Sequence, residues 1–153
     1  MSRRGVVDRD KGWNRIQREI KKARKAQVKV GVLGEGEGYY EGGDTTVLDV
    51  AVWNEFGAGN TPARPFIRGA YDQRQRELQR TSARLWNQVV AGRIDTNRAI
   101  GLLGEKHKDQ VQEYMTALDQ PPNAPSTIAA KGSSNPLIDE GRLRRSINWE
   151  RVS

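Results

Sequence analysis

Two consecutive segments of helical period constrain the fold of this 153-residue chain more than any other feature. In residues 66–91 the apolar side chains recur every three or four positions on one face, at Ile67, Ala70, Tyr71, Leu78, Leu85 and Val89. The second segment, which starts at the cap residues 95–96, repeats the pattern at Ile100, Leu103, His107, Val111, Tyr114 and Leu118. Gly92 separates the two, and the pair Pro121–Pro122 stops the second. We therefore predict an antiparallel helical hairpin.

The rest of the chain contributes shorter elements. Residues 28–33 alternate valine with other residues and predict a strand, and residues 147–152 are well suited to pair with it. Residues 47–56 could be a strand, but the capping-box spacing of Thr46 and Asp49 favours a short helix. A charged helix with a narrow apolar stripe is predicted over residues 9–26, where the stripe can dock on a surface.

Residues 139–146 predict a further short helix, with Asp139 as its N-cap and Leu143 facing inward. The fold class is therefore α+β, a small and mostly antiparallel sheet packed against two long helices. Its length corresponds to one domain. We divide it into a basic N-terminal helix over 1–27 and a single domain over 28–153, which includes an extended arm over 121–138, rich in Pro, Ser, Asn and Gly.

Composition excludes several kinds of chemistry. The chain has no cysteine and one histidine, so disulfides, thiolate nucleophiles and zinc–thiolate sites are ruled out. No apolar run approaches the roughly 20 residues that span a bilayer, and the basic N-terminus is followed by no apolar core of a signal peptide. With 35% apolar residues and a mean hydropathy of −0.81, much of the chain belongs on surfaces. We expect no cofactor, no metal and no membrane partner.

The candidates for catalysis are weak. His107 lies on the apolar face of a helix, where a packed histidine is favoured over a general base. The acidic pairs Asp139–Glu140 and Glu35–Glu37 lie in loops, where nothing holds them at working distance. The GEGEG stretch at 34–38 lacks the glycine register and the Lys-Ser/Thr of phosphate-binding loops, and its glutamates would repel phosphate. We predict that the chain is not an enzyme.

Charge is segregated along the sequence. Residues 1–29 contain eleven Lys and Arg against three acidic residues, whereas the remaining residues sum to −1. Residues 34–49 contain five acidic residues and no cation. A basic helix could thus pair with the acidic loop of a neighbouring copy, or it could face the phosphates of nucleic acid. A solvated polar helix is the third possibility.

Residues 50–71 form a stiffened turn before the first long helix. Two prolines fix the backbone and two glycines permit a tight reversal. Phe56 is expected to fill the core beneath this turn, and Phe66 and Ile67 to anchor the helix that follows. Glu55 is either exposed or accepts a charge-assisted hydrogen bond from Arg64 or Arg68. The predicted structural residues are Glu55, Phe56, Gly57, Pro62, Arg64, Pro65, Phe66 and Arg68.

Two blocks of the sequence resemble one family. NEFGAGNTPARPFIR, in this turn, is similar to the EFGT-x-x-(I)PARPF(L/I/F)R signature of phage virion-morphogenesis and tail-completion proteins, the Mu-like tail-completion and neck-protein group. PPNAPSTIAAKGSSNPLIDEGRLRRSINWERV, residues 121–152, resembles the C-terminal pattern of the same group, except that Glu140 stands where the family has Thr. The blocks lie about 50 residues apart in the family's order.

This resemblance implies a structural virion protein at the head–tail junction of a tailed phage: a neck, tail-completion or tail-terminator subunit. We expect its copies to form a ring, six-fold or twelve-fold, that contacts neck, head-closure and tail proteins around the DNA channel. The expected localisation is the virion, and the host cytoplasm during assembly. The alternative is a nonspecific DNA-binding module that uses the basic segment 3–29.

Several side chains are candidates for contacts in such an assembly. Large aromatics near polar segments gain binding energy when a partner buries them, and exposed charges steer association. The arm is expected to add backbone hydrogen bonds to the edge of a neighbouring copy. The candidate interface residues are Trp13, Arg18, Lys22, Glu35, Glu37, Trp53 and Lys131.

Overall fold

The structure, a computed structural model, describes residues 12–33, 44–59, 62–123, 125, 128–129 and 141–152. It is α+β, with a two-stranded antiparallel sheet and two long helices packed together, as predicted. In chain order the elements are α1 (Trp13–Ala23), β1 (Gln27–Val32), α2 (Val47–Phe56), α3 (Phe66–Val90), α4 (Thr96–Ala117), α6 (Arg142–Ser146) and β2 (Ile147–Val152).

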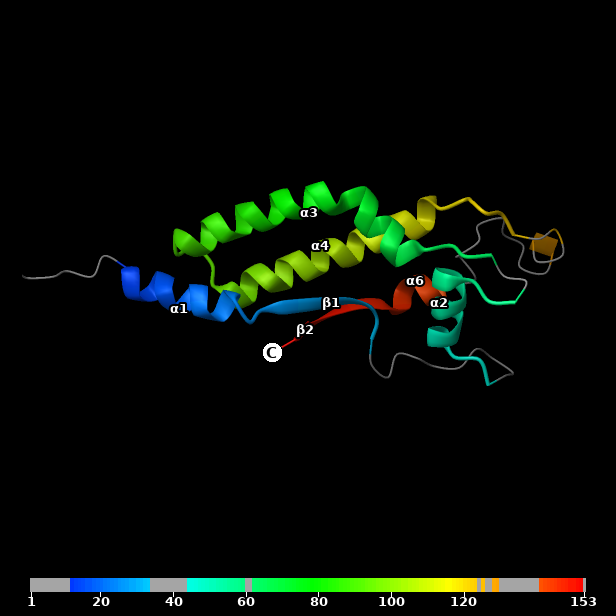
Figure 1. The fold of residues 1–153 in the computed structure, drawn as a ribbon, viewed down its shortest axis with the longest axis horizontal. Coiled ribbons are helices and arrows are strands. Elements are labelled where there is room, and N and C mark those ends of the chain that lie inside the picture. Colours follow the sequence, from blue (N-terminus) through cyan, green and yellow to red (C-terminus); the bar gives the residue numbers. More distant parts are fainter. Residues whose placement is uncertain are drawn as a thin grey trace, which may run out of the picture.

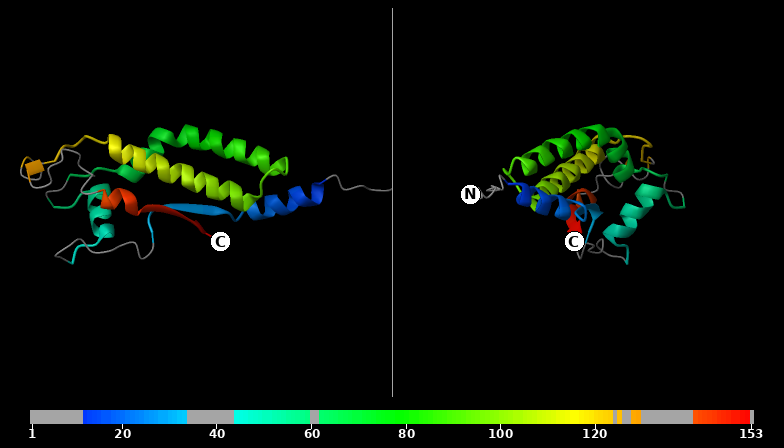
Figure 2. Two further views of the ribbon diagram at one scale, coloured as in Figure 1. Left: turned by 180° about the vertical axis from the view of Figure 1, so that it is seen from behind. Right: turned by 60° about the vertical axis from the view of Figure 1, so that its left-hand side comes forward.

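The molecule is elongated and layered (Figure 1). The hairpin of α3 and α4 lies above the sheet, and both strands pack against α4. At one end α1 meets the turn between the two long helices, and at the other end α2 and α6 lie together below the start of α3 (Figure 2). The sheet therefore covers one of the two long helices.

The local signals at the helix ends act as predicted. Thr46 and Asp49 form a reciprocal capping box at the start of α2, which decides for the helix over the alternative strand. Asp95 caps α4 by accepting from the amide of Arg98 at 2.7 Å. Gly92 follows α3 with a φ of 75°, a left-handed conformation that glycine adopts without strain. These interactions are local, and local sequence was sufficient to predict them.

The start of α6 was predicted wrongly. The helix begins at Arg142, and its N-cap is Gly141 with a φ of 68°, so Asp139 is not the cap and lies outside the described residues. Leu143 is buried, as expected. The helix predicted over 9–26 is shorter: α1 ends at Ala23, residues 24–26 are turn or irregular, and residues 9–11 lie outside the description.

The main core joins residues from distant parts of the sequence. Phe66 and Met115 are fully buried beside Leu143 and Ile147, and Val47 of α2 completes one side. A smaller cluster of Leu85, Val89 and Ala99 closes the hairpin at the other end. Burying apolar surface is the main favourable term in folding, and here it ties both ends of the chain to the hairpin.

The strands pair in a register that places Lys29 opposite Glu150 and Val30 opposite Trp149. Trp149 packs against α4 at Gly104. A Cβ added to Gly104 would be 2.7 Å from both the Trp149 ring and the Val28 side chain. Gly104 therefore sets how closely the sheet approaches α4, because any side chain there would push both strands away.

We expect Gly104→Ala to destabilise the protein by about 1–2 kcal/mol, since the clash outweighs the roughly 1 kcal/mol that alanine gains over glycine in a helix. Chemical denaturation measures the change. Gly101→Ala is the matched control, because its added Cβ would lie 3.3 Å from the far edge of the Trp149 ring. Equal effects of the two substitutions would contradict the close-approach role of Gly104.

Candidate assembly interface

Glu55 connects α2 to the N-terminus of α3. Its carboxylate is buried and accepts hydrogen bonds from the backbone amides of Ile67 at 2.9 Å and Arg68 at 3.1 Å. The guanidinium of Arg68 donates to the same carboxylate at 2.9 Å and to the carbonyl of Glu55 at 2.7 Å. A carboxylate at this position satisfies free amides of the first helical turn and complements the helix dipole. Glu55 is therefore not exposed, and its charge-assisted hydrogen bond comes from Arg68 rather than from Arg64.

Arg64 has a different partner. Its side chain is 5% exposed and donates to the carbonyls of Pro121 at 2.8 Å and Pro122 at 3.0 Å. Burial lowers the pKa of the Arg64 guanidinium from its usual value. The first residues of the predicted arm are thus held to the turn by a buried cation, which sequence reasoning did not find because the two segments are 57 positions apart.

Phe56 does not fill the core, contrary to the prediction. It is 64% exposed, and the Arg68 guanidinium lies 4.9 Å from its ring centroid, within cation–π range. Phe66 occupies the core position beneath the turn and is 0% exposed. Ile67 is partly exposed and packs against the core. The reason is geometric: the buried face of α2 carries Val47, Ala51 and Glu55, and Phe56 follows Glu55 by one position, which places it on the adjacent exposed face.

Glu55→Ala is expected to cost about 2–3 kcal/mol of folding stability, because it leaves two amides of α3 without their charged acceptor. Denaturant titration measures it. Arg68→Ala serves as the comparison and should cost less than about 1 kcal/mol, because the Arg68 side chain is 57% exposed and water replaces its ion pair. If Arg68→Ala were the more damaging change, the ion pair rather than the helix cap would hold the turn.

The helix α1 docks through polar side chains. Arg15 donates to the carbonyls of Val89 at 2.8 Å and Val90 at 2.7 Å, the last residues of α3. One turn later, Glu19 accepts from the amide of Thr96 at 2.7 Å, the first residue of α4. A cation thus meets the negative end of one helix and a carboxylate meets the positive end of the next. The pair fixes α1 across the interhelical turn.

The predicted apolar stripe of α1 docks only in part. Trp13 and Ile20 are 63% and 44% exposed, whereas Ile16 and Ala23 are partly buried. The buried residue of this helix is Glu19. Periodicity identified the helix, but it could not show that helix ends from elsewhere in the chain would attract the polar face instead.

The carboxyl of Glu19 provides a test by pH. The Lys22 ammonium and the Thr96 amide donate to it, and together with the nearby Thr96 hydroxyl they lower its pKa from 4.5 to about 2. Because the folded-state pKa is the lower one, the contribution to stability is complete above pH 4.5 and is lost as the pH falls towards 2. Glu19→Gln should be less stable by about 1–2 kcal/mol at neutral pH.

Urea titrations measure the free energy of unfolding. The difference in this free energy between the wild type and Glu19→Gln should shrink as the pH falls through this acidic range. Glu113→Gln, at a carboxylate that is 61% exposed, is the control and should show little gap at any pH. A gap for Glu19→Gln that stayed constant down to pH 2 would show that its carboxyl does not titrate with folding.

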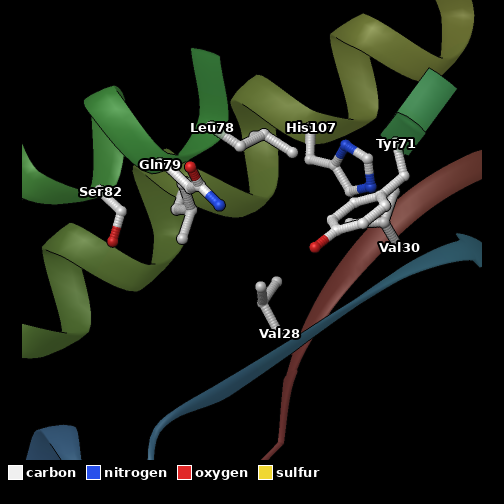
Figure 3. A pocket seen from close by; sticks show the side chains of 8 residues that line it. Val28, Val30, Tyr71, Leu78, Gln79, Ser82 and His107 are labelled. Carbon is white, nitrogen blue, oxygen red and sulfur yellow. The ribbon is translucent and has the colours of Figure 1, made fainter. Parts of the chain in front are cut away.

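Two hollows follow the side of β1 that faces away from β2. The first, about 410 Å³, is lined by β1 and by the two long helices, at Val28, Val30, Tyr71, Leu78, Gln79, Ser82, Leu103 and His107 (Figure 3). The second, about 490 Å³, lies between β1, α2 and the start of α3, and also contains Val30. No residue of β2 lines either hollow. We call the two together the β1 groove.

The β1 groove is mainly apolar and open. Large side chains that are 39–64% exposed line it, namely Leu48, Val52, Phe56 and Tyr71. They are four of the nine exposed large apolar side chains among the described residues. Contiguous exposed apolar surface of this kind is typical of a binding site. The sequence predicted the helix α2 but gave no sign that Leu48 and Val52 would border the edge of a strand.

His107 lies in the β1 groove, with its ring edge-on to Tyr71 at a centroid distance of 6.1 Å. Burial lowers its pKa, which favours the neutral imidazole. The ring nitrogen Nδ1 and the side-chain amide of Gln110 are buried without hydrogen-bond partners of good geometry among the described residues, and Gln110 lies close enough to raise the His107 pKa in part. No carboxylate lines the hollow around His107.

The remaining predicted interface residues divide into two groups. Trp53 is 42% exposed on α2, and Arg18 and Lys22 are exposed on α1, where Lys22 also pairs with Glu19 at 2.9 Å. Glu35, Glu37 and Lys131 lie outside the described residues. In the turn, Pro62 is exposed, Pro65 directly precedes α3, and Gly57 has a φ of 80°. The structure thus brings the turn residues together, whereas α1, which contains Trp13, and α2, which contains Trp53, lie at opposite ends of the molecule (Figure 1).

Comparison of the chain with protein-family models, curated proteins and solved structures gives no match. None of the helices in the described residues has the length and apolarity to cross a membrane. Within the same residues, no three His, Cys, Asp or Glu side chains gather as metal ligands would.

Proposed function

We propose that this chain is a structural virion protein of a tailed phage and acts at the head–tail junction as a neck, tail-completion or tail-terminator subunit. Its copies form a ring of six or twelve around the DNA channel and contact neck, head-closure and tail proteins. The chain acts by binding rather than by catalysis, and it works in the virion after assembly in the host cytoplasm.

The observation that carries this proposal is the meeting of the two family-like blocks. Arg64, in the first block, holds the carbonyls of Pro121 and Pro122, which begin the second. Phe66 of the first block shares the main core with Leu143 and Ile147 of the second. Segments that resemble one family's signature, and that lie about 50 residues apart, therefore form a single structural unit.

The distribution of groups along the molecule suits a ring. The basic helix α1 lies at one end, and α2, with its exposed apolar face, lies at the other (Figure 1). Two different surfaces at opposite ends favour head-to-tail contacts, and such contacts close into a ring when the rotation between copies allows it. Residues 34–49 are acidic, so their charge is opposite in sign to that of α1 and can attract the α1 of a neighbouring copy.

We expect the purified protein to form closed rings of one copy number, visible by negative-stain electron microscopy and measurable by native mass spectrometry. A phage that lacks the gene should accumulate heads and tails that are not joined or not completed. A chain that stays monomeric at high micromolar concentration, together with infectious particles made without it, would overturn the proposal.

The alternative, nonspecific DNA binding, has one structural observation in its favour: α1 presents an exposed basic row at Arg18, Lys21, Arg24 and Lys25. Binding through this row would weaken with salt, with a log–log slope of about −0.9 per phosphate neutralised. Tight binding of duplex DNA by the monomer at physiological salt, lost in Lys21→Glu/Lys25→Glu, would favour the alternative. These residues are exposed, so the variant leaves the fold intact.

A further inference from the structure

The β1 groove has the features of a site for an additional strand. Among the described residues the backbone of β1 pairs with β2 alone, so the opposite edge offers unpaired amides and carbonyls. Both strands pack against α4, so α3 extends beyond the sheet on the side of β1. Its residues line the hollow there together with Val28 and Val30. A strand added beside β1 would cover Tyr71 and Leu78 of α3 and would make the sheet three-stranded.

The lining of the groove suits such a strand chemically. Leu48, Val52 and Phe56 of α2 are exposed at successive turns of the helix and can receive alternate apolar side chains of an extended peptide. At the other end of the groove, a polar group of the added strand can pair with the buried Nδ1 of His107. Because an unpaired polar atom in the interior is unfavourable, this pairing favours occupancy.

Resting on the proposed function, we propose that the β1 groove receives residues 130–140, the distal part of the arm, from a neighbouring copy in the ring. These eleven residues can extend over about 36 Å, and the six residues of β1 span about 20 Å. The root of the arm is held by Arg64, and the chain re-enters at α6, which contacts α2. The arm therefore begins and ends at the α2 end of its own subunit.

Charge favours this occupant. The exposed ionic side chains that line the groove are the cations Lys29 and Arg68, which are 61% and 57% exposed and pair within the subunit with Glu150 at 3.8 Å and Glu55 at 2.9 Å. The arm segment 130–140 contains the apolar pair Leu137–Ile138 followed by Asp139 and Glu140, against the single cation Lys131. Acidic residues next to apolar anchors match an apolar groove with a basic rim.

A second β1 strand is a weaker occupant. Pairing of β1 with its own copy is a two-fold contact that closes as a dimer and does not continue around a ring. It would also bring the exposed Lys29 side chains of two copies towards each other, where like charges repel. An arm passed from copy to copy is heterologous and repeats around the ring.

Photocrosslinking tests the arm exchange, because the chain has no native cysteine. Two versions are co-expressed and co-assembled: one carries Lys29→Cys, labelled with benzophenone maleimide, and the other keeps Lys29 and carries Ser134→Ala as a mass marker. Trypsin cuts after Lys131 and Arg142 and releases the arm as one peptide, whose marked form is lighter by one oxygen. We expect position 29 to crosslink to marked and unmarked arm peptides in proportion to the expression of the two versions.

Arg98→Cys is the control. Arg98 is exposed and lies next to Trp149 of β2, and labelling there should give no arm peptide. Crosslinks from position 29 to unmarked arm alone would mean that the arm folds onto its own subunit, and crosslinks to residues 1–11, to 34–43 or to another protein would identify a different occupant. Each of these results, or no crosslink at all, overturns the arm exchange.

The same sample separates this inference from the proposed function. Rings seen by native mass spectrometry, without marked arm peptides, would overturn the arm exchange and leave the ring intact. Monomers without crosslinks would overturn both.

Discussion

The buried carboxylate of Glu55 is the interaction on which the arrangement of α2, the turn and α3 depends. It accepts two backbone amides of the first turn of α3 and the guanidinium of Arg68. These bonds set where the long helix begins and hold α2 beside it. Since α2 also forms one wall of the β1 groove, the same carboxylate positions the apolar surface that we propose as a contact between copies.

Charged side chains that bind helix ends connect the elements of this molecule at several places. Glu55 meets the N-terminus of α3, Arg15 meets its C-terminus, and Glu19 meets the N-terminus of α4. Arg64 adds a fourth connection, at the carbonyls that begin the arm. Such bonds are directional, whereas apolar burial is not. A chain with a modest apolar content can therefore orient its peripheral elements around a small core.

The sheet has two strands and two long helices above it, and this imbalance creates the groove. Gly104 lets Trp149 approach α4 closely, so the strands lie beneath α4 and leave the underside of α3 accessible beside β1. An accessible strand edge next to an apolar face is a hazard for uncontrolled pairing unless it is covered. A neighbouring copy in a ring would cover it, which relates the proposed exchange of arms to the stability of the sheet itself.

The sequence by itself determined the helical hairpin, the short helix α2 and the pairing of the terminal strand with β1. These follow from periodicity, caps and alternation, which act between near neighbours. Only the tertiary structure decided that Phe56 is exposed, that Arg64 binds the root of the arm, that Glu19 rather than the apolar stripe of α1 is buried, and that α6 starts at Gly141. Each of these depends on which groups from distant parts of the chain pack against an element and on which of its faces they cover, and a linear pattern does not carry that information.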